Sequence, residues 1–175
     1  EDFAHWHDRL EIHGLDLRHT PSVETFARQL QQDQNRLDFI LNNACQTVRR
    51  PPGFYAHLMA DERKLAHALP APARRLLESY ESLLEESPQP QQDAVALPEQ
   101  VGSSLAGIQR AAELSQIPLV PEDAQTGQGL FPAGELDGDL QQVDLRSINS
   151  WRLRLAEVST VELLEVQLVN SIAPF

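Results

Sequence analysis

The sequence has 175 residues, of which 14 are Lys or Arg and 26 are Asp or Glu, so its formal net charge is −12. Nucleic acids and anionic membranes bind basic faces, so this balance excludes both as expected partners. No apolar run approaches the roughly 18–20 residues that cross a bilayer. The single cysteine, Cys45, allows no intrachain disulfide, which favours a reducing, cytoplasmic location.

The segment from Leu10 to Leu41 has the pattern of a βαβ unit. Residues 10–17 alternate as a short strand does, and residues 37–41 (LDFIL) form a compact apolar run of strand length. Between them, Thr20-Pro21 is a typical helix start. The span matches the approximately 30 residues of a βαβ crossover. We therefore expect an α/β fold containing part of a Rossmann-type, doubly wound parallel sheet.

The middle of the chain has a different pattern. Residues 72–86 predict a helix with one apolar face, residues 87–93 a Pro/Gln linker, and residues 118–139 a long surface loop. Residues 103–116 predict a weaker second helix. Near the end, Ser159 and Glu162 have the spacing of a capping box. The helix that follows carries an apolar stripe of Val161, Leu164, Leu168 and Ile172.

Three stretches, in order, resemble the short-chain dehydrogenase/reductase family. They are Gly14-Leu15-Asp16-Leu17, Leu41-Asn42-Asn43-Ala44-Cys45 and Val166-Gln167-Leu168-Val169-Asn170. The first is similar to the aspartate–aliphatic pair that follows the family's third strand. The second is similar to its Asn-Asn-Ala-Gly signature, and the third to the helix that ends on its catalytic asparagine.

The resemblance implies an oxidoreductase that transfers hydride between NAD or NADP and a carbonyl or alcohol substrate. It assigns cofactor binding to Asp16, through the adenine amino group, to the Leu17 backbone, and to Asn42, Asn43, Ala44 and Cys45. Members of the family are commonly dimers or tetramers, so a homo-oligomer is implied as well. Read without the family, Asp16 is also typical of a turn before a helix, and Asn42-Asn43 of an ordinary turn.

Asn170 has a separate physical argument. Pro174 lies four residues later and has no N–H, so the Asn170 carbonyl is free to bind something else if the helix extends that far. In the family this carbonyl holds a water of the proton relay, and we hypothesise that role for Asn170. A solvated mid-helix asparagine is the alternative.

The sequence also departs from the family. Cys45 replaces a glycine, and we interpret it as a small buried residue rather than a nucleophile. We assign residues 1–45 to a partial Rossmann unit, residues 46–150 to an insertion, and residues 151–175 to the return of that fold. The insertion is interpreted either as a substrate-shaping lid or as an oligomerisation arm.

The chain lacks a Gly-rich turn after a strand and the family's Tyr-x-x-x-Lys pair. We expect these elements before Glu1 and after Phe175, so the isolated chain is expected to be inactive. The alternative to an enzyme is a non-enzymatic protein-interaction module on the same scaffold. Two smaller patterns are interpreted as exposed surface: the basic pair Arg49-Arg50, which otherwise suits a cofactor phosphate, and His5-x-His7, which otherwise suits a metal.

Overall fold

The computed structural model describes residues 2–62, 68–85, 106–124 and 129–175, and the structural statements below concern these residues. They form short helices joined by irregular segments, and the only β-bridge among them joins Leu136 and Gln142. The helical elements are η1 (Phe3–His5), η2 (His7–Arg9), α1 (Thr20–Asp33), α2 (Pro52–Tyr55), η3 (Ala56–Leu58), α3 (Met59–Glu62), α4 (Ala71–Arg75), α5 (Glu78–Glu85), α6 (Ala106–Gln109), α7 (Ala111–Ser115), η6 (Pro121–Ala124), η7 (Leu155–Glu157), α8 (Thr160–Gln167) and the π-helical turn η8 (Leu168–Ile172).

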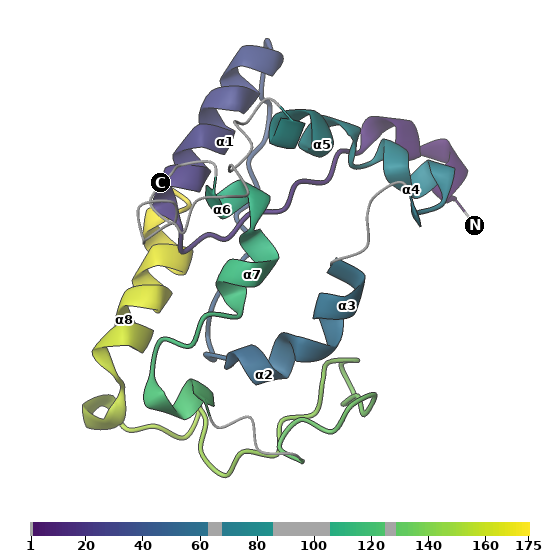
Figure 1. Ribbon diagram of the computed structural model, residues 1–175. Helices are drawn as coiled ribbons and strands as arrows, with labels where there is room; N and C mark the ends of the chain where they lie inside the picture. Colours follow the sequence, from purple (N-terminus) through teal and green to yellow (C-terminus); the bar gives the residue numbers. More distant parts are fainter. Residues whose placement is uncertain (1, 63–67, 86–105, 125–128) are drawn as a thin grey trace, which may run out of the picture.

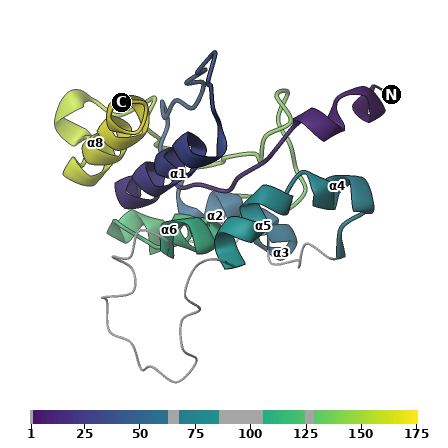
Figure 2. The same ribbon diagram turned by 90° about the horizontal axis from the view of Figure 1, so that it is seen from above.

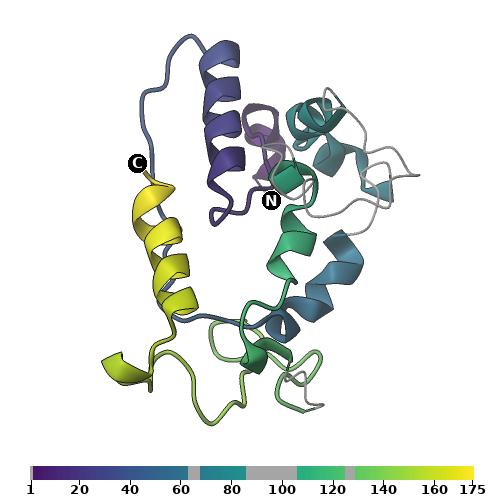
Figure 3. The ribbon, with the colours of Figure 1, turned by 60° about the vertical axis from the view of Figure 1, so that its left-hand side comes forward.

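The helices are spread around an open arrangement. Helices α1 and α8 lie along one side, α6 and α7 follow the middle, and α2 to α5 occupy the other side (Figure 1). Figure 3 shows the same separation, with α1 and α8 opposite α3 and α7. Seen from above, α8 also lies apart from α2, α3 and α5 (Figure 2). Contacts between these parts therefore depend on a few side chains and on the irregular segments.

The predicted α/β fold is wrong for the described residues, because they contain no sheet. Residues 10–17 and 37–41 form no strand; Ile12 donates its N–H to the carbonyl of Leu76, 2.8 Å away, between α4 and α5. Phe39 and Leu41 are 86% and 90% exposed. A parallel strand needs neighbours that pair its backbone and helices that cover both of its faces. Without them, the apolar patterns do not produce a Rossmann-type sheet, and residues 1–45 form no βαβ unit.

The predicted helix at Thr20-Pro21 is confirmed as α1. Pro21 occupies its first turn, and on its exposed face Arg28 binds Glu24 at 3.0 Å, one turn away. At its start, the Nδ1 atom of His19 lies 2.7 Å from the hydroxyl of Ser22. The ring of Phe26 packs against the ring of His13, with 5.0 Å between centroids, so the helix anchors the residues that precede it.

Helix α6 approaches the start of α1 through a glycine. A Cβ atom built on Gly107 would lie 2.1 Å from the Ser22 hydroxyl oxygen and 2.2 Å from Nδ1 of His19. No side chain fits there, so glycine is required by the close approach of the two helices. The neighbouring Ile108 is 1% exposed, and Tyr80 of α5 donates its hydroxyl to the Ile108 carbonyl at 2.8 Å.

The middle of the chain is less regular than its sequence predicts. The helix expected over 72–86 is split into α4 and α5, which a turn at Leu76-Leu77 separates. Residues 87–93 lie outside the described residues. The loop expected over 118–139 is irregular where it is described, apart from η6, and residues 125–128 lie outside the described residues as well.

Apolar burial is small. Among the described residues, the buried hydrophobic side chains are Phe54, Met59, Leu83 and Ile108. Four polar or charged residues are equally buried: Ser22, Asp123, Gln142 and Glu165. The described segments are therefore held together by polar contacts to a larger extent than in domains with a larger apolar core. No helix among the described ranges is both long and apolar enough to span a bilayer.

Candidate functional site

A cavity of about 540 Å³ lies where the three motif stretches meet. Its lining includes Asp16 and Leu17 from the first stretch, Ala44 and Cys45 from the second, and Val169 from the third. These residues are distant in sequence, so their meeting is a property of the fold. The volume falls within the roughly 300–1,000 Å³ of small-molecule sites.

Asn170, next to Val169, ties the second stretch to the third. Its side-chain Nδ2 donates to the carbonyl of Gln46 at 3.0 Å, and its Oδ1 accepts the N–H of Gln46 at 2.7 Å. The helix does extend past Asn170 as η8, and Phe175 donates its N–H to Ile172. Pro174 has no N–H to offer the Asn170 carbonyl, as its sequence position implies.

Not all predicted cofactor residues reach the cavity. Asn42 and Asn43 are exposed and stand outside its lining, and Asn43 closes a tight turn by donating its N–H to Leu41 at 3.1 Å. Cys45 lines the cavity but is exposed, so the interpretation of a small buried residue is wrong. The reason is that the expected sheet, which would cover it, is not formed.

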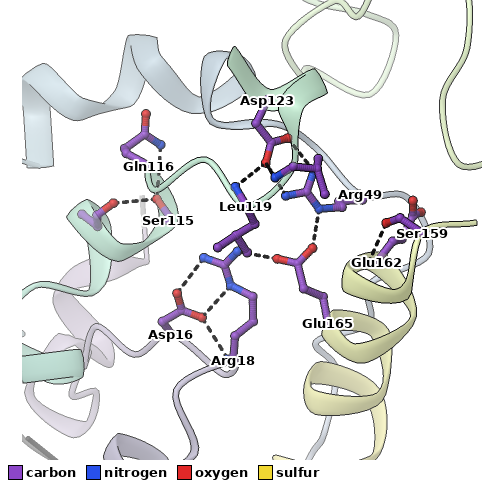
Figure 4. A network of polar contacts seen from close by, with 12 residues as sticks. Asp16, Arg18, Arg49, Ser115, Gln116, Leu119, Asp123, Ser159, Glu162 and Glu165 are labelled. Atoms are coloured by element: carbon purple, nitrogen blue, oxygen red, sulfur yellow. Dashed lines mark hydrogen bonds and ion pairs between the residues drawn. The ribbon is translucent and has the colours of Figure 1, made fainter. Parts of the chain in front are cut away.

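A chain of ion pairs runs along one side of the cavity, and Figure 4 shows its side chains. Glu165 of α8 is 4% exposed; its Oε1 accepts from Nη1 of Arg18 at 2.7 Å, and its Oε2 pairs with Nε of Arg49. Arg18 also binds both carboxylate oxygens of Asp16, at 2.8 and 3.0 Å. Arg49 binds both oxygens of Asp123, at 2.5 and 2.6 Å. This charge network (Asp16, Arg18, Glu165, Arg49, Asp123) joins four separate segments.

The network shifts the pKa values of Arg18, Arg49 and Asp123. The hydrogen bond to Asp16 is the main cause that raises the pKa of Arg18, and the bond to Asp123 does the same for Arg49, against the lowering effect of burial. Burial alone would raise the pKa of Asp123. Hydrogen bonds from Arg49 and from the backbone N–H groups of Leu119 and Val120 outweigh burial and lower it. The charges of Arg18, Arg49 and Asp123 therefore persist through the neutral range.

A second pair of arginines binds Asp144. Arg146 contacts it through Nε at 2.9 Å and Nη2 at 2.8 Å, and Arg50 pairs with its Oδ2. Burial tends to raise the pKa of Asp144, but the bonds from Arg146 and Arg50 lower it overall. The interpretation of Arg49-Arg50 as an exposed basic loop is wrong, because their side chains are only 11% and 21% exposed.

Tyr55 also lines the cavity and is not an ionised group. Burial raises the pKa of its phenol above the usual value near 10, more than Arg50 and Arg18 lower it. At neutral pH the phenol is therefore protonated and acts as a hydrogen-bond donor or acceptor. The residue four positions later is Met59, so Tyr55 has no lysine partner at the family's spacing.

The sequence pattern missed the residues that close the cavity. Glu165 stands between apolar neighbours in α8, and the predicted apolar stripe included Leu164 and Ile172. In the structure these two are 57% and 51% exposed, and Glu165 is buried instead. An isolated acidic residue among apolar ones is a usable signal, but its partners Arg18 and Arg49 are too distant in sequence to be identified by spacing.

One polar atom of the cavity lining is unsatisfied. The amide Nε2 of Gln46 is buried and has no hydrogen-bond partner in the described part of the chain, which is costly for a donor. Within the described ranges, no group of three or more His, Cys, Asp or Glu residues is arranged to hold a metal ion.

Comparison with known proteins gives no relative: no family model matches the chain, and neither a curated protein nor a solved structure is significantly similar to it.

Proposed function

We propose that this chain contributes to the NAD(P) site of an oxidoreductase of the short-chain dehydrogenase type, which transfers hydride between NAD(P) and a carbonyl or alcohol substrate. The observation that carries the proposal is the meeting of Asp16, Leu17, Ala44, Cys45 and Val169 around one cavity. The motifs were identified by their residue types and order alone. Their meeting, among described residues that form no sheet, is therefore independent support.

The residues around the cavity fit parts of a dinucleotide. The protonated phenol of Tyr55 lines the cavity and can bond a ribose, phosphate or carboxamide oxygen. The Asp16 carboxylate accepts three hydrogen bonds from Arg18, which leaves about one of its four lone-pair positions for an amino group. Ala44 allows a sugar to approach the main chain. NAD(P) supplies the hydride chemistry when bound, and these residues bind and orient it.

The chain holds only part of a catalytic apparatus. It has no Tyr-x-x-x-Lys pair, so it lacks the acid–base groups that the proposed reaction needs. The purified chain is accordingly expected to bind NAD(P) without reducing carbonyl compounds. The single, exposed Cys45 thiol also suits the reducing cytoplasm that we propose as its location.

The test is a titration of the 175-residue chain with NADH and NADPH, followed by nicotinamide fluorescence. Ala44→Phe fills the cavity and should weaken binding at least tenfold. Ala27→Phe is the matched control, because Ala27 is an exposed residue of α1 outside the cavity. Absence of saturable binding, or equal affinities for the two variants, would contradict the proposal.

A protein-interaction module is the second candidate, and one observation favours it. Residues 46–150 expose several large apolar side chains, including Leu145 at 58% and Ile148 at 63%. Such side chains suit a protein interface, which includes the homo-oligomer that the resemblance implies. If the chain has this function, Ile148→Asp should disrupt the oligomer and so lower the sedimentation coefficient. Neither NADH nor NADPH should then bind.

A further inference from the structure

A second cavity, of about 590 Å³, lies beside the first. One wall is the segment 45–58, and the other is formed by the turn at 136–142 together with Trp151. Cys45, Val48, Arg50, Tyr55 and Leu58 line both cavities. Ligands in the two cavities would therefore lie on either side of one short segment, and hydride transfer requires such proximity between cofactor and substrate.

The turn at 136–142 exposes the apolar side chain of Leu140 from a strained backbone conformation. Asp137 fixes the turn: its Oδ1 accepts the N–H groups of Asp139 and Gln141, each at 2.9 Å. Leu140 adopts a left-handed conformation, with φ of 61°, and is 79% exposed. Leucine rarely adopts this conformation, and strain of this kind concentrates at binding sites. The hydrogen bonds of the turn hold this conformation, and an apolar ligand would cover the side chain that it exposes.

The cavity offers a hydrogen-bond acceptor beside this apolar wall. Nδ1 of His57 lies 3.1 Å from the carbonyl of Phe54, which only accepts, so Nδ1 carries the proton and Nε2 of the neutral ring is an acceptor. Gln142 is 4% exposed and fixes the wall, because its Nε2 donates to the carbonyl of Pro132 at 2.7 Å. Nε2 of His57 therefore matches a ligand that donates a hydroxyl proton.

We propose that this second cavity binds an alcohol that carries an aromatic or branched apolar group. The apolar group lies against Leu136, Leu140 and Trp151, and the hydroxyl donates to Nε2 of His57. This inference rests on the proposed function, because it assigns the substrate class of the same oxidoreductase. It assigns to residues 46–150 a substrate-shaping role.

The experiment uses 1-phenylethanol as the probe and the fluorescence of Trp151 as the signal. Trp6→Phe removes the other tryptophan of the chain. In that background, 1-phenylethanol should change the fluorescence saturably. Leu140→Gly relieves the left-handed strain and removes the apolar contact, so binding should weaken about tenfold. Leu155→Gly is the control, because Leu155 is 93% exposed and outside the cavity.

Ethylbenzene, which lacks the hydroxyl, separates the polar contact from the apolar one. His57→Ala should weaken 1-phenylethanol about fivefold and leave ethylbenzene unchanged, whereas Leu140→Gly should weaken both. The inference is overturned if neither probe saturates, or if Leu140→Gly and Leu155→Gly behave alike. Circular dichroism of each variant identifies those that fail to fold.

The two proposals fail in different ways. If dinucleotide binds and Ala44→Phe prevents it, but neither aromatic probe affects Trp151, the substrate site is wrong and the proposed function stands. If the probes bind as expected and no dinucleotide binds, the second cavity is an alcohol site and the proposed function is wrong.

Discussion

The carboxylate of Glu165 lies 2.7 Å from the guanidinium of Arg18, although 147 positions separate the two residues in the chain. Glu165 also pairs with Arg49. A single buried side chain therefore connects α8 to the two segments that carry Arg18 and Arg49. Few apolar residues are buried in the described ranges, so this carboxylate contributes more to positioning the segments than a charged residue does in a domain with a full core.

Glu165→Gln should therefore destabilise the chain strongly. The substitution keeps the shape of the side chain but leaves Arg18 and Arg49 with less compensating charge, and breaking a buried pair costs about 3 kcal/mol. Urea denaturation gives the free energy of unfolding. Glu24→Gln removes an exposed pair with Arg28 and should cost about 0.5 kcal/mol or less. Equal losses in the two variants would show that the network is not a structural link.

Acid should unfold the chain partly through Asp123. Its pKa is lowered in the folded state, so its contribution is present above the unfolded value of 3.8 and is lost as the pH falls through the lower folded value. Asp123→Asn should lower the stability at pH 7 and reduce its change between pH 5 and pH 2. Thermal unfolding across this range measures the effect. Parallel pH profiles for the two proteins would contradict it.

Asn170→Ala should loosen the backbone at Gln46. The variant loses both hydrogen bonds between the Asn170 amide and the Gln46 main chain, each worth about 1 kcal/mol. Hydrogen exchange at the Gln46 amide should become at least fivefold faster. Asn43→Ala, at an exposed position outside the cavity, should leave that rate unchanged. Unchanged exchange in Asn170→Ala would mean that η8 does not hold this segment.

Gly107→Ala should separate α6 from α1. The added Cβ would meet the side chains of Ser22 and His19 at distances that no relaxed structure allows, and overpacking of this kind costs about 1–3 kcal/mol. Gly138→Ala adds the same methyl group where no atom lies within 4 Å, so its stability should stay close to that of the parent chain. The midpoints of thermal unfolding of the two variants measure this difference in stability.

Local patterns predicted helix starts correctly. Thr20-Pro21 begins α1, and Ser159 accepts the N–H of Glu162 at 3.1 Å at the start of α8. Both signals depend on neighbours within one turn, and the sequence contains those neighbours. The apolar stripes were less informative, because a stripe indicates which face can be buried and not what is available to cover it.

The sheet and the charge network could not be predicted in this way. A strand at 37–41 depends on partners elsewhere in the fold, and the described residues provide none. The pairing of Glu165 with Arg18 and Arg49 depends on the path of the whole chain. The motif residues were nevertheless useful: Asp16, Leu17, Ala44 and Cys45 line one cavity, whereas Asn42 and Asn43 do not.

The exposed segment 37–41 has a consequence for the chain in concentrated solution. Its residues Leu37, Phe39, Ile40 and Leu41 favour extended backbone, and they are 60–90% exposed in the structure. Short runs of this composition are templates for intermolecular strand pairing, and natural proteins interrupt them with charged residues. Asp38 is the only such interruption here, and it is paired with Arg36. We therefore expect this segment to pair between chains as the concentration rises.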